Sequence, residues 1–205
     1  MSKGFRLFLL ENADRGGRPA DSEQLVRKAA LLYGVPDREL AQAAWLRTAA
    51  GKPYFADAAV HFSISHTEGL WACLMGPAVC GLDIQQIRPC NYEKIAGRFF
   101  SPRESESVRA GGLRAFFALW TAREAVGKYT GGGFFSALPE LVREDGRPAA
   151  RIIFDGGEEL ALRQLQLKGA GGAGARGEQK ADVFCAVCLP AAKAKEVIDE
   201  VYLSL

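Results

Sequence analysis

The sequence predicts an α+β fold, in which short strands and amphipathic helices follow one another in runs. A coarse order of strand, helices and strands occurs twice along the 205 residues, a length that suits one large domain or two small ones. Hydrophobic residues make up 48% and charged residues 24%, as in ordinary soluble globular proteins. With 26 basic and 24 acidic residues, the net charge of +2 gives no sign of a polyanionic partner such as nucleic acid.

The first run begins with an apolar strand at residues 5–10. An amphipathic helix follows, which Asp21 or Ser22 can cap and which Gly34 ends. A second, shorter helix is expected over residues 37–47. The first run therefore places two helices directly after its first strand.

Three strands are expected next, after a turn or loop in residues 51–57. Residues 61–66 and 70–75 have the composition of two strands joined by a short turn, and residues 79–84 that of a third strand. Together they predict an antiparallel meander.

The second run begins with a helix at residues 92–100 and a new helix that starts at Ser101 with a capping box to Glu104. After two glycines, a helical pattern covers residues 116–129, and a glycine run from Gly131 stops it. Apolar segments separated by turn residues then predict strands at residues 141–144, 151–154, 160–167 and 182–189.

The helical segment that contains residues 116–129 carries the most informative residues. At about 100° per residue, Trp120, Glu124 and Lys128 fall within roughly 80° of one another on one strip of the helix. Apolar side chains cover much of the remaining circumference, so this charged strip is poorly placed to be simply solvated. It is either a structural ion pair or part of a site.

Asp83 and Gln85 close an apolar strand and are two residues apart, so their side chains lie on the same face. Oxygen ligands on one face suit a hard cation such as Mg²⁺, which completes its octahedron with water and substrate phosphate. The spacing alone equally fits a strand-end aspartate that caps a turn.

Ser65 and His66 end a strand at a turn, and Lys52 lies upstream. Their hydroxyl, imidazole and ammonium groups suit a phosphate monoester. Each is singly also an ordinary turn residue. A serine-hydrolase triad is disfavoured, because neighbours on a strand face opposite sides and the G-x-S-x-G elbow is absent.

Two other motifs carry little weight. Residues 169–174 spell G-x-G-x-x-G, but a polar segment and then a strand follow, so no helix N-terminus is available for a phosphate. Cys185 and Cys188 lie three apart in a strand and should face opposite sides, which disfavours zinc or redox chemistry.

Residues 88–109 combine five basic side chains with apolar and aromatic ones. The pattern fits a surface helix with its apolar side in the core, and also a docking face for an acidic helical protein. The N-terminus lacks the apolar run of a signal peptide, and no stretch reaches a membrane-spanning length. We therefore expect a cytoplasmic protein with reduced cysteines, no membrane association and no nucleic-acid partner.

Four ordered blocks resemble the 4'-phosphopantetheinyl transferase superfamily, specifically the Sfp-type enzymes. They are GKPYF, HFSISHTEGLWACL, CGLDIQQIRP with RFFSPRE, and LWTAREAVGKYTGGGF, spread over roughly residues 45–190. The resemblance implies Mg²⁺-dependent transfer of phosphopantetheine from coenzyme A (CoA) to a serine of an apo acyl- or peptidyl-carrier protein, with release of 3',5'-ADP.

The resemblance also assigns roles. It implies that Asp83 and Glu124, with Gln85, hold Mg²⁺ on the CoA pyrophosphate. Glu124 takes the proton of the carrier serine, directly or through a water on the metal, and Lys128 contacts the phosphate undergoing transfer. The remaining residues implied to bind CoA, at its nucleotide end, are Lys52, Ser65, His66 and Arg47.

The family fold implies two similar α/β halves related by a pseudo-two-fold, each a small antiparallel sheet packed with helices, with the site between them. We expect an N-terminal half at residues 1–82, a C-terminal half at residues 83–205 and a monomeric enzyme whose carrier docks on residues 88–109. Two residues depart from the family pattern: Gln85 replaces the second carboxylate of D-x-E, and Arg123 replaces the lysine of W-x-x-K-E-A. The first departure keeps a non-catalytic CoA- or carrier-binding homologue open as an alternative. A purely structural domain, in which Glu124 and Lys128 form only a helix-surface pair, is a third reading.

Overall fold

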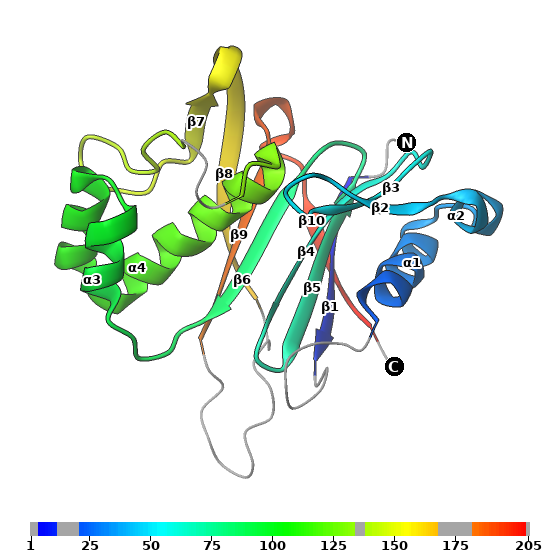
Figure 1. Cartoon of the computed structure of the whole chain (residues 1–205), viewed down its shortest axis with the longest axis horizontal. Helices are drawn as coiled ribbons and strands as arrows, with labels where there is room; N and C mark the ends of the chain where they lie inside the picture. The colour runs from blue at the N-terminus through cyan, green and yellow to red at the C-terminus, as the bar shows by residue number, and fades with distance from the viewer. Residues whose placement is uncertain (1–3, 12–20, 134–137, 168–181, 204–205) are drawn as a thin grey trace, which may run out of the picture.

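The computed structural model describes residues 4–11, 21–133, 138–167 and 182–203. It has a mixed α+β architecture of two four-stranded sheets, a two-stranded arm and helices on the outer faces of the sheets (Figure 1). The predicted α+β class is thereby confirmed. The glycine-rich motif at residues 169–174 lies outside the described residues.

The first sheet has the order β10-β1-β5-β4. Its strands are β1 (Phe5–Glu11), β4 (His61–Thr67), β5 (Leu70–Gly76) and β10 (Ile198–Tyr202). The predicted β4–β5 hairpin is confirmed, with Thr67 opposite Leu70. β10 was not predicted, and it pairs with β1 in parallel, so this sheet is mixed rather than purely antiparallel.

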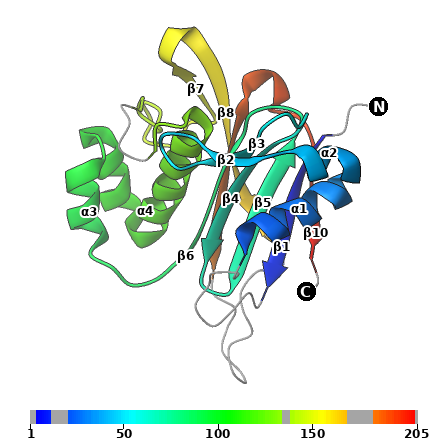
Figure 2. The ribbon, with the colours of Figure 1, turned by 45° about the vertical axis from the view of Figure 1, so that its right-hand side comes forward.

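Helices α1 (Ser22–Tyr33) and α2 (Asp37–Gln42) pack beside this sheet (Figure 2). Asp21 caps α1 through the backbone N–H groups of Glu23 and Gln24, and Gly34 ends it with a φ of 96°. Both ends agree with the sequence prediction.

The expected extension of the second helix to residue 47 is wrong, and the turn or loop expected at residues 51–57 is wrong at residues 53–55. Residues Trp45–Arg47 form β2, which pairs antiparallel with β3 (Pro53–Phe55). The reason is tertiary packing, because the rings of Trp45, Phe55 and Phe62 lie within 5.5 Å of one another, centroid to centroid.

The second sheet has the order β6-β9-β8-β7. Its strands are β6 (Gly81–Gln86), β7 (Arg151–Phe154), β8 (Glu158–Gln166) and β9 (Val183–Pro190). Short 3-10 helices cover Asp155–Gly157 and Ala191–Lys193. The strand expected at residues 141–144 is wrong, since only an isolated bridge between Val142 and Pro148 forms there.

The predicted meander is also wrong in its third strand. β6 runs beside β4 (Figure 1) but its backbone pairs with β9 in the second sheet. The N–H groups of Leu82, Ile84 and Gln86, which point towards β4, donate to side-chain hydroxyls on that strand. Those hydroxyls replace the backbone acceptors that a continuous sheet would supply.

Helices α3 (Tyr92–Phe99) and α4 (Pro102–Thr130) cover the outer face of the second sheet. The capping box predicted between Ser101 and Glu104 is present. Gly112 has φ 65° and ψ −153°, so α4 consists of two helical segments joined at this glycine, as the sequence indicated. Gly131 ends the helix in a left-handed conformation.

Three hydrophobic cores follow from strand alternation. On β1, Phe8 and Leu10 face the core under α1, whereas Leu7 and Leu9 face a central core between the two sheets. A third core lies between the second sheet and helices α3 and α4. β6 is therefore held between the central core and α4, which fixes the position of the polar residues at its end.

The five cysteines are free thiols, and all but Cys90 are buried. Cys185 lies in the central core and Cys188 in the core under α4, so the two do face opposite sides of β9, as predicted. None of the described helices combines the length and the apolar character needed to cross a membrane.

Candidate active site

One cavity of about 480 Å³ collects the polar residues that the sequence singled out. Its walls come from β2, the turn before β3, β4, β6 and the second segment of α4. All eight predicted site residues line it: Arg47, Lys52, Ser65, His66, Asp83, Gln85, Glu124 and Lys128. Trp120, the third member of the predicted helix strip, lines it too.

The helix strip faces β6 at Asp83, which lies inside the strand and does not close it as the sequence indicated. Lys128 Nζ lies 2.8 Å from Asp83 Oδ1 and donates a hydrogen bond to it. The ion pair predicted as an alternative for this strip therefore involves Lys128 with Asp83 on a different element. Helical spacing places Lys128 on the strip and strand alternation places Asp83 on one face of β6. The packing of α4 on β6 then brings the two side chains together.

Asp83 is buried and accepts a second hydrogen bond at the same oxygen, from Ser65 Oγ at 2.7 Å. Ser65 Oγ itself accepts from the backbone N–H of Ile84 at 3.2 Å. The carboxylate of Asp83 is thus held from two sides by a cation and a hydroxyl.

Glu124 lies one helical turn before Lys128 and is half-buried. Burial raises the pKa of the Glu124 carboxyl above its ordinary value, and the negative charge of Asp83 raises it further, while Lys128 opposes both effects. Two carboxylates that face one cavity are a usual arrangement for binding a cation.

The basic residues lie on the other wall of the cavity. Lys52 Nζ donates to the backbone carbonyl of Cys80 at 2.9 Å, and burial is the main cause that lowers its pKa. Arg47 donates to the carbonyl of Gly51 at 2.9 Å. Their positive charges, with the imidazole of His66 nearby in the lining, give this wall the character of an anion site.

The donor set fits Mg²⁺. Asp83, Glu124 and the side-chain carbonyl of Gln85 offer oxygen ligands, which Mg²⁺ prefers, and few protein ligands are needed because water and substrate phosphate complete the shell. No group of three or more His, Cys, Asp or Glu side chains in the described part of the chain is arranged to hold a metal. The candidate oxygen set therefore has two carboxylates and one amide, Gln85, in place of a third carboxylate.

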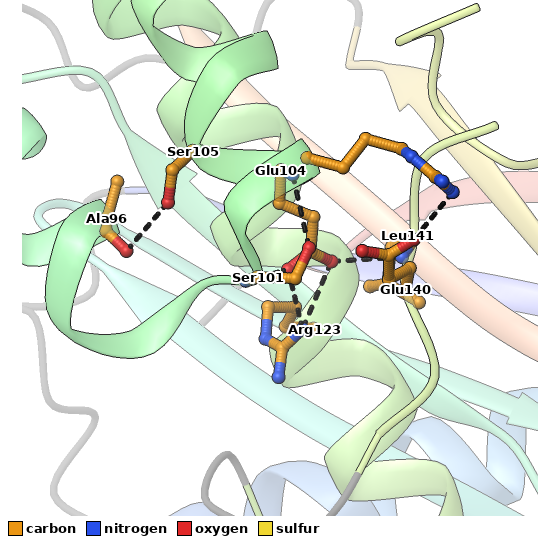
Figure 3. A network of polar contacts seen from close by, with 8 residues as sticks. Ala96, Ser101, Glu104, Ser105, Arg123, Glu140 and Leu141 are labelled. Carbon is orange, nitrogen blue, oxygen red and sulfur yellow. Dashed lines mark hydrogen bonds and ion pairs between the residues drawn. The ribbon is translucent and has the colours of Figure 1, made fainter. Parts of the chain in front are cut away.

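A buried polar network fixes α4 behind the cavity (Figure 3). The fully buried Glu104 accepts hydrogen bonds from Arg123 Nη1, at 3.1 Å to each carboxylate oxygen, and from the backbone N–H groups of Ser101 and Leu141, both at 2.9 Å. Arg123 precedes Glu124 directly, so this network ties the helix at the site to the start of α4 and to the chain near Leu141.

Sequence reasoning missed two features of the site. It did not anticipate that Glu104 would bind Arg123, because the residues are 19 positions apart. It also overlooked Gly81, where an added Cβ would lie 1.9 Å from the carbonyl oxygen of Ala125. The glycine at the start of G-L-D was the available signal, since a glycine inside a strand can mark a close backbone approach.

This combination of an α+β fold with an acidic pair, a lysine and a basic wall around one cavity defines a protein suited to a phosphate-containing ligand and a divalent cation. The family model of the 4'-phosphopantetheinyl transferase superfamily matches residues 79–188, which is more than half of the chain. The chain therefore belongs to this superfamily, and the resemblance noted in its sequence is confirmed.

Several curated relatives are similar over part of their length. The 4'-phosphopantetheinyl transferase HetI of Nostoc sp. is 37% identical over 40% of this chain and 39% of its own. The 4'-phosphopantetheinyl transferase of Bacillus subtilis is 33% identical over 55% of this chain and 53% of its own. The corresponding gsp protein of Aneurinibacillus migulanus is 30% identical over 55% of this chain and 48% of its own. The chain thus spans about half, or less, of the length of these relatives.

Proposed function

We propose that this protein transfers the 4'-phosphopantetheine group of CoA to a serine of an apo acyl- or peptidyl-carrier protein and releases 3',5'-ADP. The convergence of Asp83, Glu124 and Lys128 in one cavity carries this proposal, because a member of this superfamily would need oxygen ligands and a cation around a pyrophosphate. The transferase names of the similar proteins support the same reaction.

In the proposed reaction the serine Oγ of the carrier forms a bond to the phosphorus on the pantetheine side of the pyrophosphate. The bond from that phosphorus to the bridging oxygen breaks, and 3',5'-ADP leaves with the electron pair. Glu124 accepts the serine proton, and its raised pKa makes it a better base than an ordinary glutamate. Lys128 neutralises charge that develops on the phosphate oxygens.

Asp83, Glu124 and Gln85 would hold Mg²⁺ in this cavity. The ion, when bound, neutralises negative charge on the pyrophosphate and orients it. Gln85 supplies an uncharged oxygen where the family pattern has a carboxylate, so Gln85→Glu is expected to tighten Mg²⁺ binding or leave it unchanged. A large loss of activity in Gln85→Glu would instead give the amide a positive role.

Lys52, His66 and Arg47 would bind the nucleotide end of CoA, whose 3'-phosphate is a phosphate monoester. They line the basic wall of the cavity, and a group with two negative charges benefits most from several cationic or N–H donors. The family resemblance also implies Ser65 as a member of this group.

We propose two halves at residues 1–82 and 83–205, related by a pseudo-two-fold with the active site at their interface. The halves follow the two sheets closely but not fully, because β10 returns from the second half to the first sheet and β6 begins at Gly81. The cavity supports this division, because its lining residues come from elements on both sides of residue 82. We further propose a monomer in the cytoplasm, a compartment that suits five free thiols.

The carrier is proposed to dock on residues 88–109, without a role for nucleic acid or membrane. Arg98 and Arg103 lie in this segment, are exposed and would meet acidic residues of the carrier. Arg98→Glu should raise the KM for the carrier more than that for CoA, whereas Arg38→Glu, in α2 on the opposite side of the molecule (Figure 1), should leave both unchanged. A rise in the KM for CoA alone would assign the basic segment to the nucleotide site.

The reaction is tested by incubating the protein with CoA, Mg²⁺ and a panel of apo acyl- and peptidyl-carrier proteins and measuring the carrier by intact-mass spectrometry. The proposal predicts the addition of one phosphopantetheine to at least one carrier. CoA binding without modification of any carrier would instead support a non-catalytic CoA- or carrier-binding homologue, the alternative that the neutral Gln85 favours.

A further inference from the structure

The edge strands of the two sheets, β4 and β6, are joined by side-chain hydroxyls rather than by a backbone ladder. The N–H groups of Leu82 and Gln86 donate to Ser63 Oγ at 3.0 Å and Thr67 Oγ1 at 3.1 Å. Ser65 occupies the middle place, where its Oγ accepts from the N–H of Ile84 at 3.2 Å. This row of three hydroxyls on alternate residues of β4 is called the hydroxyl seam below.

Ser65 has a second bond that ties the seam to the site. Its hydroxyl donates to Asp83 Oδ1 at 2.7 Å, and both residues are only 6% exposed. A serine hydroxyl carries a single proton. While that proton is donated to Asp83, Ser65 has none to offer to a phosphate oxygen, which at neutral pH can only accept.

We propose that Ser65 is a positioning residue for the metal ligand Asp83, and not a ligand of the CoA phosphates. This inference rests on the proposed function, because it assumes that the cavity holds a divalent cation with CoA.

The geometry behind this role is local. Ser65 Oγ is fixed by the N–H of Ile84, which directly follows Asp83 on β6. The hydroxyl can therefore not follow a rotating carboxylate, and it holds Asp83 Oδ1 in one place, shared with Lys128 Nζ. Oδ2 is then the oxygen with which Asp83 can bind a cation while keeping both bonds. Partners that orient a ligating carboxylate in this way commonly matter about 10–100-fold for metal affinity.

The seam itself supplies a matched control. Thr67 Oγ1 makes the same kind of bond to β6, and Thr67 is also buried, but it does not line the cavity. Thr67→Ala therefore removes a seam bond without touching Asp83. Ser65→Ala removes both a seam bond and the bond to Asp83, and Ser65→Cys keeps the shape of the side chain with only a weak donor.

The experiment measures binding, so that it does not depend on transfer. Mn²⁺ is titrated into each purified protein in the presence of CoA, with free Mn²⁺ followed by electron paramagnetic resonance and CoA alone as the blank. Affinities for CoA and for 3'-dephospho-CoA, which lacks the phosphate monoester, are measured by calorimetry. Thermal denaturation checks that each variant folds.

We expect Ser65→Ala and Ser65→Cys to weaken Mn²⁺ binding about 10–100-fold and Thr67→Ala to leave it unchanged. The ratio of affinities for CoA and 3'-dephospho-CoA should stay at the wild-type value in all three.

Unchanged Mn²⁺ binding in Ser65→Cys would overturn the proposal, as would a wild-type protein that binds no Mn²⁺ with CoA. Loss of the preference for CoA over 3'-dephospho-CoA in Ser65→Ala would return Ser65 to the phosphate site. If the protein modifies no carrier but Ser65→Ala and Ser65→Cys weaken Mn²⁺ binding as expected, the proposed transferase activity is refuted and the role of Ser65 stands.

Discussion

Lys128 Nζ and Asp83 Oδ1 lie 2.8 Å apart, so the cation of helix α4 already neutralises the carboxylate of β6 before any ligand binds. A divalent cation that binds Asp83 must compete with this ammonium group. The same lysine is proposed to act on the phosphate during transfer. Removal of the Lys128 charge should therefore strengthen the binding of the divalent cation but slow the transfer.

Lys128→Met should tighten the binding of Mg²⁺ in the absence of CoA by roughly 5-fold, since a partly exposed ion pair is worth about 1 kcal/mol. It should lower the kcat of transfer by about 100-fold, the usual cost of removing a group that stabilises developing charge. Calorimetry and single-turnover transfer measure the two quantities. Lys195 is exposed and does not line the cavity, so Lys195→Met serves as the control. Weaker Mg²⁺ binding in Lys128→Met would contradict the competition.

The raised pKa of Glu124 predicts how its replacement changes stability with pH. A carboxyl whose pKa is raised on folding contributes stability that is fully present below its ordinary value of 4.5 and is lost as pH rises through the folded value. Glu124→Gln should therefore raise the Tm of the metal-free protein at pH 7.5, and this gain should shrink as pH falls towards 4.5. Thermal denaturation in EDTA measures it. The exposed Glu144→Gln should show little effect at either pH, and a pH-independent difference for Glu124→Gln would contradict the account.

Gly81→Ala should separate β6 from α4. An added Cβ would lie 1.9 Å from the carbonyl oxygen of Ala125 and 2.7 Å from the backbone nitrogen of Tyr129. Both are backbone atoms of a helix, which cannot move away as the end of a flexible side chain can. We expect a loss of about 3 kcal/mol or more in unfolding free energy, and loss of activity, because Asp83 and Glu124 would move apart. Denaturant unfolding gives the free energy.

The matched control for Gly81→Ala is Gly97→Ala, in the interior of α3, where nothing lies within 4 Å of an added Cβ. It should be neutral or stabilise the protein by up to about 1 kcal/mol, as alanine generally does in a helix. Equal effects of the two substitutions would show that the close approach at Gly81 is unimportant.

The Glu104–Arg123 pair should be structural. Glu104→Gln leaves the buried guanidinium of Arg123 without its counter-charge and should cost about 3–5 kcal/mol. Arg123→Lys, which restores the family residue, keeps the charge and should cost less. Arg103→Met breaks the exposed ion pair with Glu140 and should cost no more than about 1 kcal/mol. Urea unfolding gives the free energy of unfolding of the three variants. Equal losses of this free energy in Glu104→Gln and Arg103→Met would contradict the claim that the buried pair stabilises the protein more than the exposed one.

Local sequence patterns predicted the elements whose signals are themselves local. The caps at Asp21, Gly34 and Ser101 and the hairpin of β4 and β5 follow from turn chemistry and strand alternation. The helix strip of Trp120, Glu124 and Lys128 follows from helical periodicity, and all three residues line the cavity. Periodicity therefore located the side chains of the candidate site even though it could not show how they meet.

Features that depend on long-range pairing were not predictable in this way. β6 has the composition of a third meander strand, yet it joins β9, about one hundred residues later, because the hydroxyls of β4 take its other N–H groups. Strands β2 and β3 have three residues each, too few for a periodic signal, and are formed by the packing of Trp45 and Phe55. β10 has two adjacent exposed acidic residues, Asp199 and Glu200, between the half-buried Ile198 and Val201 at a sheet edge, so it carried no apolar run to detect.

The most direct test of the account is transfer by the wild-type protein compared with Glu124→Gln, using CoA, Mg²⁺ and one apo carrier that the wild type modifies, with the exposed Glu144→Gln as control. Intact-mass spectrometry of the carrier should show one added phosphopantetheine with the wild type and Glu144→Gln, and nearly none with Glu124→Gln in the same time. A Glu124→Gln protein that modifies the carrier at the wild-type rate would contradict the central role given to this cavity.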